Sequence, residues 1–239
     1  MSLNIITHTN SKSPVSEAYR TLRTNIQFAN IDKKIKTIVV TSSEKSEGKS
    51  TTISNLAETF AQAGNRVVIV DADLRRPRLH KLFNLSNQQG LTNVLAGQIE
   101  LRQGITSACS DVHVMTSGPV PPNPSELLGS EKMKELVRVL SEHYDIVLFD
   151  TPPVNAVTDA AILSTVVDGV ILAVASGKTD IEGGKRAMKS LQAVNANLLG
   201  AVMTMIPVSK KGYYGYQYYS YEIDARPMKK RKKLFKRSK

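Results

Sequence analysis

The feature that most constrains the fold is a short polar loop between a β-branched run and the start of a helix. Thr37-Ile38-Val39-Val40 precedes the loop, and Gly48-Lys49-Ser50-Thr51 opens a helical segment after it. In a phosphate-binding loop, backbone N–H groups and the positive end of the helix dipole converge on phosphate oxygens. The residues that we expect to bind a nucleotide are Ser46, Glu47, Gly48, Lys49, Ser50 and Thr51.

Two of these residues carry side chains suited to a nucleotide. The Lys49 ammonium is expected at the β- and γ-phosphates, and the Ser50 hydroxyl is expected to ligate Mg²⁺. The loop departs from the usual G-x-x-x-x-G-K-[ST] pattern, because Ser43 occupies the position of the first glycine. An ordinary strand-to-helix turn that happens to contain Gly-Lys-Ser is the alternative interpretation.

Two later apolar runs end in carboxylates. One Val/Ile run leads to Asp71 and Asp73, and a second apolar run leads to Asp150. Strands of parallel sheets are continuous apolar runs, and their C-terminal ends carry the ligand sites. We therefore expect all three carboxylates near Lys49, where Asp150 fits the Walker B pattern of an acid that holds Mg²⁺. Two aspartates that merely begin a turn are the alternative for Asp71 and Asp73.

Strand-like and helix-like segments alternate along the chain. This alternation predicts an α/β fold with a doubly wound, mostly parallel sheet, of the P-loop NTPase type with a deviant Walker loop. Residues 1–13 are expected to be a loosely ordered N-terminus, 14–206 one domain, and 207–239 a flexible tail. Further strands are expected at 112–116, 169–175 and 198–206, a rigid proline-rich loop at 117–124, and helices at 14–30, 130–143, 159–166 and 180–196.

The formal charge of +11 suggests a nucleic-acid partner until its distribution is considered. Eight positive charges and no acid lie in the last eleven residues, which leaves 11 − 8 = +3 for the rest. The basic character therefore belongs to a tail, and we expect no nucleic-acid partner. The tail cations are Lys229, Lys230, Arg231, Lys232, Lys233, Lys236, Arg237 and Lys239.

Other compositional features indicate a cytoplasmic location. A single cysteine, Cys109, excludes an internal disulfide framework and a cysteine-rich metal site. No apolar run is long enough to span a bilayer, and the N-terminus lacks the basic start and apolar core of a signal peptide.

A tyrosine cluster marks the segment after residue 207. Six of the eight tyrosines fall within nine residues, with interleaved glycines and no apolar periodicity. A packed core does not have this pattern. A stacking surface for single-stranded nucleic acid and a low-complexity tail are two interpretations of it. The clustered tyrosines are Tyr213, Tyr214, Tyr216, Tyr218, Tyr219 and Tyr221.

Glu17, Arg20 and Arg23 lie at i, i+3 and i+6 on the first predicted helix, which Ser13 is expected to cap. From the residues alone, a solvated flank with a weak ion pair explains this spacing.

Four features together resemble the bacterial tyrosine kinases that regulate capsular and exopolysaccharide synthesis, from about Ser16 to Tyr221. They are Glu17-x-x-Arg20-x-x-Arg23, the segment Val70-Asp71-Ala72-Asp73-Leu74-Arg75-Arg76-Pro77, the segment 116–128, and the tyrosine cluster.

The resemblance implies an ATP- and Mg²⁺-dependent protein-tyrosine kinase that phosphorylates its own tyrosine cluster, between subunits, and tyrosines of other proteins. It assigns catalysis to Lys49, Asp71, Asp73 and Asp150, and the metal to Ser50, Asp73 and Asp150. Whether Asp71 or Asp73 is the base stays open.

The resemblance also implies partners. Glu17, Arg20 and Arg23 would join subunits into a ring. A separate transmembrane activator would hold the kinase at the inner face of the plasma membrane. The basic tail is expected either to contact anionic lipid or to be a solvated end. A non-kinase ATPase switch of the MinD/ParA type and a non-enzymatic regulatory scaffold are the alternatives.

Two further departures concern the nucleotide. Glu44-Lys45-Ser46-Glu47 replaces a loop centre that contains Pro-Gly in the family, and this change is expected to alter nucleotide affinity. Thr204-Met205 replaces an Asn-Arg pair near adenine, so the sequence assigns no residue that contacts the base.

Overall fold

The structure is a computed structural model that describes residues 5–30, 34–109 and 111–207. The chain divides into two units, Met1–Ile206 and Pro207–Lys239. The tyrosine cluster and the cations of the tail lie outside the described residues, so only the first unit is described below.

A seven-stranded sheet forms the centre of this unit, in the order β3-β4-β2-β5-β1-β6-β7. Neighbouring strands are parallel except for β3 and β4, which pair antiparallel. The mostly parallel α/β sheet predicted from the sequence is confirmed. The strands are β1 (Thr37–Ser42), β2 (Val67–Asp71), β3 (Ile105–Cys109), β4 (Val112–Met115), β5 (Ile146–Asp150), β6 (Gly169–Ala175) and β7 (Leu198–Thr204).

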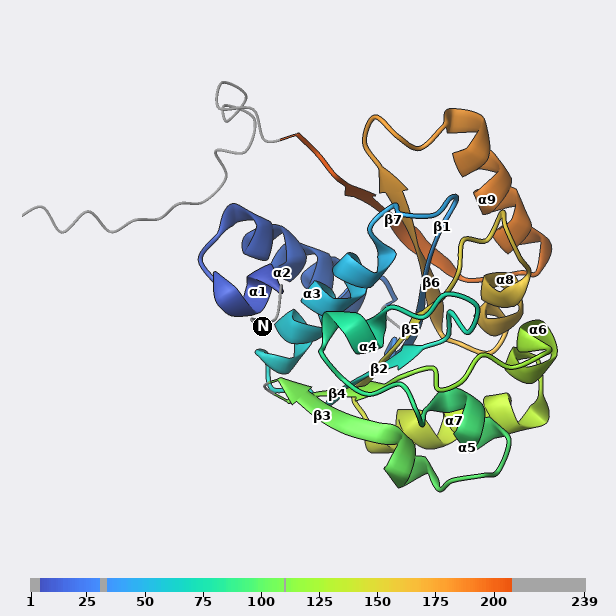
Figure 1. Cartoon of the computed structure of the whole chain (residues 1–239). Coiled ribbons are helices and arrows are strands. Elements are labelled where there is room, and N and C mark those ends of the chain that lie inside the picture. Colours follow the sequence, from blue (N-terminus) through green and yellow to red (C-terminus); the bar gives the residue numbers. More distant parts are fainter. Residues whose placement is uncertain (1–4, 31–33, 110, 208–239) are drawn as a thin grey trace, which may run out of the picture. The chain divides into compact units, whose positions relative to one another are not determined.

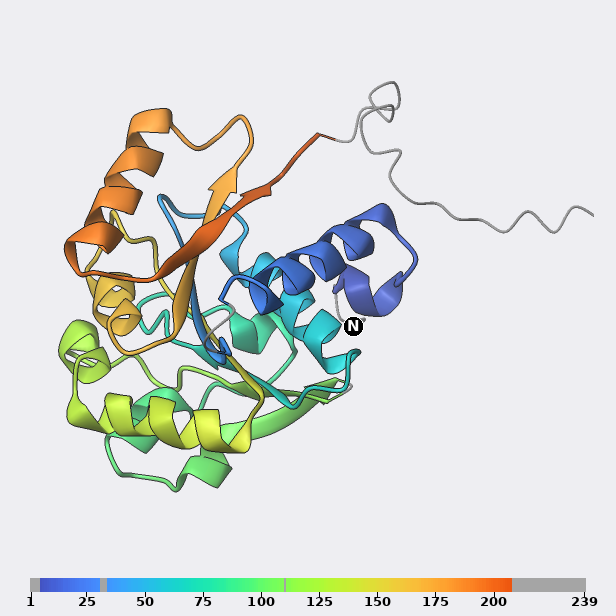
Figure 2. The same ribbon diagram turned by 180° about the vertical axis from the view of Figure 1, so that it is seen from behind.

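Helices cover both faces of the sheet. Figure 1 shows α1, α2 and α3 together on one side and α7, α8 and α9 on the other, and Figure 2 shows the same layers from behind. The helices are α1 (Ile6–Thr9), α2 (Pro14–Gln27), α3 (Lys49–Ala61), α4 (Leu79–Leu82), α5 (Leu91–Leu95), η1 (Leu101–Gly104), α6 (Pro124–Leu128), α7 (Glu131–His143), α8 (Asp159–Ser164) and α9 (Ile181–Ala193).

The core lies in two apolar layers, because successive residues of a strand point to opposite faces. Ile38 and Val40 of β1 pack with Phe60 of α3 on one face. Val39, between them in sequence, packs on the other face with Leu140 of α7. The continuous apolar runs of the central strands are thus buried on both sides, as a parallel sheet requires.

The N-terminus is more ordered than the sequence predicts. Residues 5–13 were expected to be loosely ordered, but Ile6–Thr9 form α1, and Ile5 and Thr7 are fully buried. The backbone N–H and the Oγ1 of Thr7 both donate to Oδ1 of Asn55 in α3, at 3.0 and 3.1 Å. Tertiary hydrogen bonds therefore order a polar segment that has little apolar periodicity of its own.

Three other elements were missed by the sequence-based prediction, one of them the short helix η1. Pro124–Leu128 form α6, where a loop was predicted up to Pro124, and Ile105–Cys109 form the antiparallel strand β3. The cap predicted at Ser13 is confirmed, since its Oγ accepts from the N–H of Ser16, and Oγ of Ser130 accepts from the N–H of Met133 in the same way. Across the described ranges, no helix combines the length and apolar character needed to cross a bilayer.

Candidate active site

The predicted site residues meet at the carboxyl edge of the sheet. Lys49 starts α3 directly after the loop that follows β1, and its Nζ donates to Oγ of Ser42 at 3.1 Å. The Ser50 hydroxyl donates to Oδ2 of Asp150, at the end of β5, at 2.6 Å. Asp71 ends β2 directly opposite Asp150 in the parallel register. Three strand ends therefore bring one ammonium, one hydroxyl and two carboxylates together.

The loop has the backbone shape of an anion-binding turn. Ser46 and Gly48 have φ values of 60° and 87°, both left-handed, and Gly48 is the N-cap of α3. No side chain caps this helix end. The first N–H groups of a helix have no intrahelical acceptor, so they are available to phosphate oxygens.

Two buried aspartates at this edge have perturbed ionisation. Burial raises the pKa of Asp150 to about 6, although the hydrogen bond from Ser50 and the charge of Lys49 act in the opposite direction. Burial and then the charge of Asp150 raise the pKa of Asp71 well above its ordinary value, against N–H donors from Leu79 and Arg78. Each carboxylate is thus costly to ionise next to the other.

Lys49 interacts electrostatically with the acids of this edge. Burial lowers the pKa of its ammonium, and the charges of Asp150 and Asp73 oppose that change. Asp73 is only half-buried, and its Oδ1 accepts from the N–H of Arg76 at 3.0 Å. The four groups form one electrostatic cluster in which acids outnumber cations.

The donor set fits Mg²⁺ of the P-loop type. Oδ1 of Asp71 and Oδ1 of Asp150 are buried and accept no hydrogen bond from the protein. Within the described residues no three His, Cys, Asp or Glu side chains could hold a metal by themselves. P-loop sites need fewer protein ligands, because waters and phosphate oxygens complete the shell around one hydroxyl and one carboxylate. Ser50 and Asp150 supply such a pair.

The side chain of Glu47 has a structural role in the loop that the sequence did not predict. Glu47 is fully buried, and both of its carboxylate oxygens accept from Oγ of Ser43 at 3.0 Å. Its Oε2 accepts from the N–H of Glu44 at 2.9 Å, and its Oε1 accepts from Oγ1 of Thr179. No pattern in the sequence pointed to Thr179, which lies 132 residues from Glu47.

The segment after Asp73 is hydrogen-bonded to helices α6 and α8. Nε of Arg75 donates to Oδ2 of the buried Asp159 at 2.9 Å, and Nη2 of Arg75 donates to Oγ of Ser125 at 2.9 Å. Ser125 in turn donates to Oδ1 of Asp159 at 2.7 Å. This cluster connects the 70–77 and 116–128 segments, which the sequence singled out separately.

Glu17, Arg20 and Arg23 lie on α2, away from the carboxylates. Nη1 of Arg20 pairs with Glu17 at 2.8 Å on the surface. Arg23 has a different environment, because its Nη1 donates to the carbonyl oxygen of Thr59 in α3 at 2.7 Å. Within one protomer, Arg23 therefore joins two helices, while Arg20 and Glu17 remain accessible.

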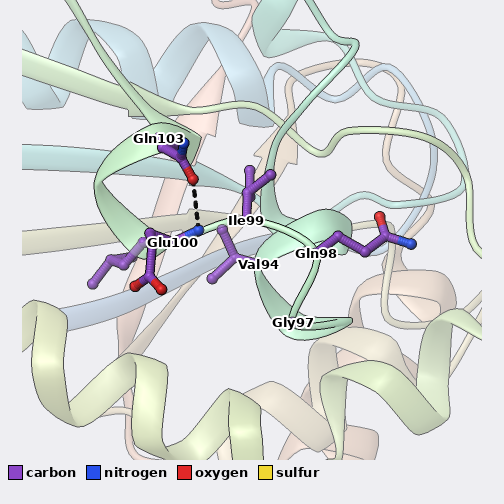
Figure 3. A pocket seen from close by; sticks show the side chains of 7 residues that line it. Val94, Gly97, Gln98, Ile99, Glu100 and Gln103 are labelled. Carbon is purple, nitrogen blue, oxygen red and sulfur yellow. Dashed lines mark hydrogen bonds between the residues drawn. The ribbon is translucent and has the colours of Figure 1, made fainter.

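Two cavities among the described residues lie away from this site. One, of about 400 Å³, is lined by Val94 and by residues 97–101 and 103, around the end of α5 and η1 (Figure 3). The other, of about 490 Å³, lies against α7 and is lined mainly by apolar atoms. Neither contains a residue of the loop or an acid from a strand end.

Comparisons with known proteins show which family this chain resembles. A family model described as an AAA domain matches residues 34–203. The tyrosine-protein kinase YwqD of Bacillus subtilis (strain 168) is 48% identical over 218 residues, which are 90% of this chain and 92% of that protein.

Two solved structures are similar over most of their length. The chimerical protein CapA2B2 superposes with a TM-score of 0.82 at 42% identity, over 85% of this chain and 90% of that one. The kinase domain of the Escherichia coli tyrosine kinase ETK gives 0.81 at 34% identity, over 87% and 85%.

Proposed function

This chain belongs to the bacterial tyrosine-protein kinases, and from that membership we propose that it transfers the γ-phosphoryl group of ATP to tyrosines of its own tail. The observation that carries the proposal is the meeting of Lys49, Ser50, Asp71 and Asp150 at one sheet edge. Regulation of capsular or exopolysaccharide synthesis is the proposed role of this activity.

The loop and its lysine would bind the substrate. The N–H groups at the start of α3 face the phosphates, and the Lys49 ammonium neutralises charge on the β- and γ-oxygens. Ser50 and Asp150 would hold Mg²⁺, with Asp73 as a further candidate ligand. When bound, Mg²⁺ neutralises the charge that develops on the transferred phosphoryl group.

The acceptor is a tyrosine hydroxyl, which must lose a proton with an ordinary pKa of about 10. Asp73 is half-buried and Asp71 fully buried, so an incoming side chain reaches Asp73 more easily. We therefore assign to Asp73 the role of the base that accepts the proton of the tyrosine hydroxyl. As the tyrosine oxygen bonds to the γ-phosphorus, the bond to the β–γ bridging oxygen breaks and ADP leaves. Asp71 would instead hold the start of α4, because its Oδ2 accepts from the N–H groups of Arg78 and Leu79.

The proposed acceptors are Tyr213 to Tyr221, and the transfer is proposed to occur between subunits of a ring. Support for the ring comes from the accessible Glu17 and Arg20 on α2 and from the family resemblance. A separate transmembrane activator is the proposed partner that brings the kinase to the membrane. The basic tail is proposed as a second contact, with anionic lipid.

A labelling experiment tests the transfer. Purified protein and its activator are incubated with γ-labelled ATP and Mg²⁺, and the labelled residues are mapped. We expect label on Tyr213–Tyr221 that falls at least about 100-fold in Lys49→Met, since the lost ammonium stabilises transition-state charge. Lys134→Met, at an exposed lysine paired with Glu131, is the matched control and should label normally.

Three other outcomes would count against parts of the proposal. Phosphate release without tyrosine label would indicate an ATPase switch, and neither product would indicate a scaffold. Transfer between subunits is tested by mixing Lys49→Met chains with active chains whose tail tyrosines are replaced by phenylalanine. An unlabelled Lys49→Met tail in that mixture would exclude it.

A further inference from the structure

Side chains from two distant segments hold the outer side of the phosphate loop. Lys178, in the turn between β6 and α9, donates from Nζ to the carbonyl oxygens of Lys45 at 3.2 Å and Ser46 at 2.8 Å. Thr204, the last residue of β7, donates from Oγ1 to the carbonyl oxygen of Glu47 at 2.7 Å. Three consecutive loop carbonyl groups are therefore bonded on the side of β6 and β7.

This arrangement fixes the direction of three N–H groups. A trans peptide group is planar, so the N–H of each residue points opposite to the carbonyl of the residue before it. Bonding the carbonyls of residues 45–47 outward consequently turns the N–H groups of Ser46, Glu47 and Gly48 inward. Among the described residues, these three N–H groups make no hydrogen bond of normal geometry to a protein acceptor. Converging free N–H groups form an anion-binding nest.

Thr204 approaches the loop so closely that the loop residue beside it must be small. A Cβ atom added to Gly48 would lie 3.3 Å from the Thr204 side chain, and the φ of +87° at Gly48 is strained for other residues. The glycine therefore serves the contact with Thr204 as well as the turn.

Thr179, the neighbour of Lys178, makes a further contact with the loop. The hydroxyl of Thr179 donates to the buried carboxylate of Glu47, which also accepts from Ser43 and from the N–H of Glu44. The same β6–α9 turn thus holds both the backbone and one side chain of the loop. The Glu47 carboxylate thus holds residues 43–47 together by hydrogen bonds that require no bound phosphate.

We propose that Lys178 and Thr204 are positioning residues that orient the N–H groups of the phosphate loop for nucleotide. The inference rests on the proposed function only in that the loop receives the phosphates of ATP. Both side chains are bonded to outer carbonyl oxygens, so they act through the loop rather than on the phosphates. Their loss should therefore weaken nucleotide binding and leave turnover at saturating ATP nearly unchanged.

Direct binding of ADP with Mg²⁺, measured by titration calorimetry on the full chain, tests this role. Losing one such hydrogen bond should weaken ADP binding about 5-fold in Lys178→Ala or Thr204→Val, and about 20-fold in the double variant. The kcat at saturating ATP should stay within about 2-fold, because these contacts are equal in the ground and transition states. Thr204→Ser, which keeps the hydroxyl, should bind ADP as the original chain does.

Lys185→Ala is the matched control, because this exposed lysine of α9 pairs only with Glu182 among the described residues and should not affect ADP affinity. Unchanged ADP affinity in the double variant would overturn the inference. So would Thr204→Ser binding as weakly as Thr204→Val, since that result indicates packing rather than hydrogen bonding. An original chain that binds ADP but labels no tyrosine would count against the proposed function alone.

Discussion

At the scale of single residues, the site is defined by charges that the fold keeps out of water. Asp150 and Asp71 face each other from neighbouring strands, and burial raises the pKa of both. Without a bound cation, such a pair destabilises the fold once it ionises. The same property suits the proposed metal, because a divalent cation compensates the repulsion.

Asp150→Asn should therefore stabilise the ligand-free protein while removing activity. The folded pKa of about 6 lies above the ordinary 3.8, so the stability linked to this group is complete below pH 3.8 and is lost as pH rises through about 6. At pH 7 the variant should gain on the order of 1–3 kcal/mol in the free energy of unfolding. Its stability should also fall less between these two pH values, as measured by chemical denaturation.

Asp145→Asn, just before the other end of β5, is the control with the opposite sign. The N–H of Arg66 lowers the pKa of Asp145, so its charge stabilises the fold and its removal should lower stability at pH 7. If Asp150→Asn instead proves less stable than the original chain at pH 7, ionised Asp150 is stabilising and the explanation above is wrong.

At the scale of elements, one buried amide connects the N-terminal helix to the helix that carries the phosphate loop. Oδ1 of Asn55 accepts both donors of Thr7, and its Nδ2 donates to the carbonyl oxygen of Thr51 at 2.9 Å. An asparagine inside a helix is not favoured by propensity. Its position is therefore explained by the contact with α1.

Asn55→Ala should release α1 from α3. The buried N–H of Thr7 would lose its acceptor, which costs about 2 kcal/mol in the free energy of unfolding. Amide hydrogen exchange in residues 5–13 should rise more than elsewhere. Asn65→Ala, beyond the C-terminal end of α3, removes only a bond to the carbonyl of Phe60 and is the control. Equal protection of residues 5–13 in Asn55→Ala and the original chain would show that the other contacts of α1, such as the bond from Nε2 of Gln62 to the carbonyl oxygen of Thr7, hold it without Asn55.

At the scale of the whole molecule, the two arginines of α2 have different roles. Among the described residues, the guanidinium of Arg20 donates to the exposed Glu17 and to the carbonyl oxygen of Ser11, at 2.8 and 2.6 Å. Arg23 bonds to α3, so its replacement also weakens the protomer. A variant at Arg20 therefore tests assembly more cleanly than the double variant Arg20→Ala with Arg23→Ala.

Arg20→Ala should lower the particle mass in solution toward that of one protomer, as measured by light scattering. Its unfolding midpoint should change little, since an exposed ion pair contributes at most about 1 kcal/mol. Arg138→Ala, at an exposed arginine of α7 paired with Glu135 and Glu142, should leave the mass unchanged. A ring that persists in Arg20→Ala would reject the proposed contribution of this residue to assembly.

The sequence by itself determined the parallel strands of the sheet and the edge at which the acids lie. Continuous apolar runs such as Ile146–Phe149 must be buried on both faces of the sheet. Because Asp150 follows this run directly, it must lie at the carboxyl end of the strand. The same local signals, a serine at the cap and periodic apolar residues, gave α2 and α7. These properties depend on neighbours in the chain.

Only the tertiary structure decided which distant side chains hold the loop. Lys178, Thr179 and Thr204 reach residues 45–47 across more than 130 positions, and no local pattern distinguishes them from surface lysines and threonines. The position of Thr7 likewise depends on the distant Asn55. Hydrogen bonds of this kind have no periodicity along the chain, because their partners meet only once the sheet has formed.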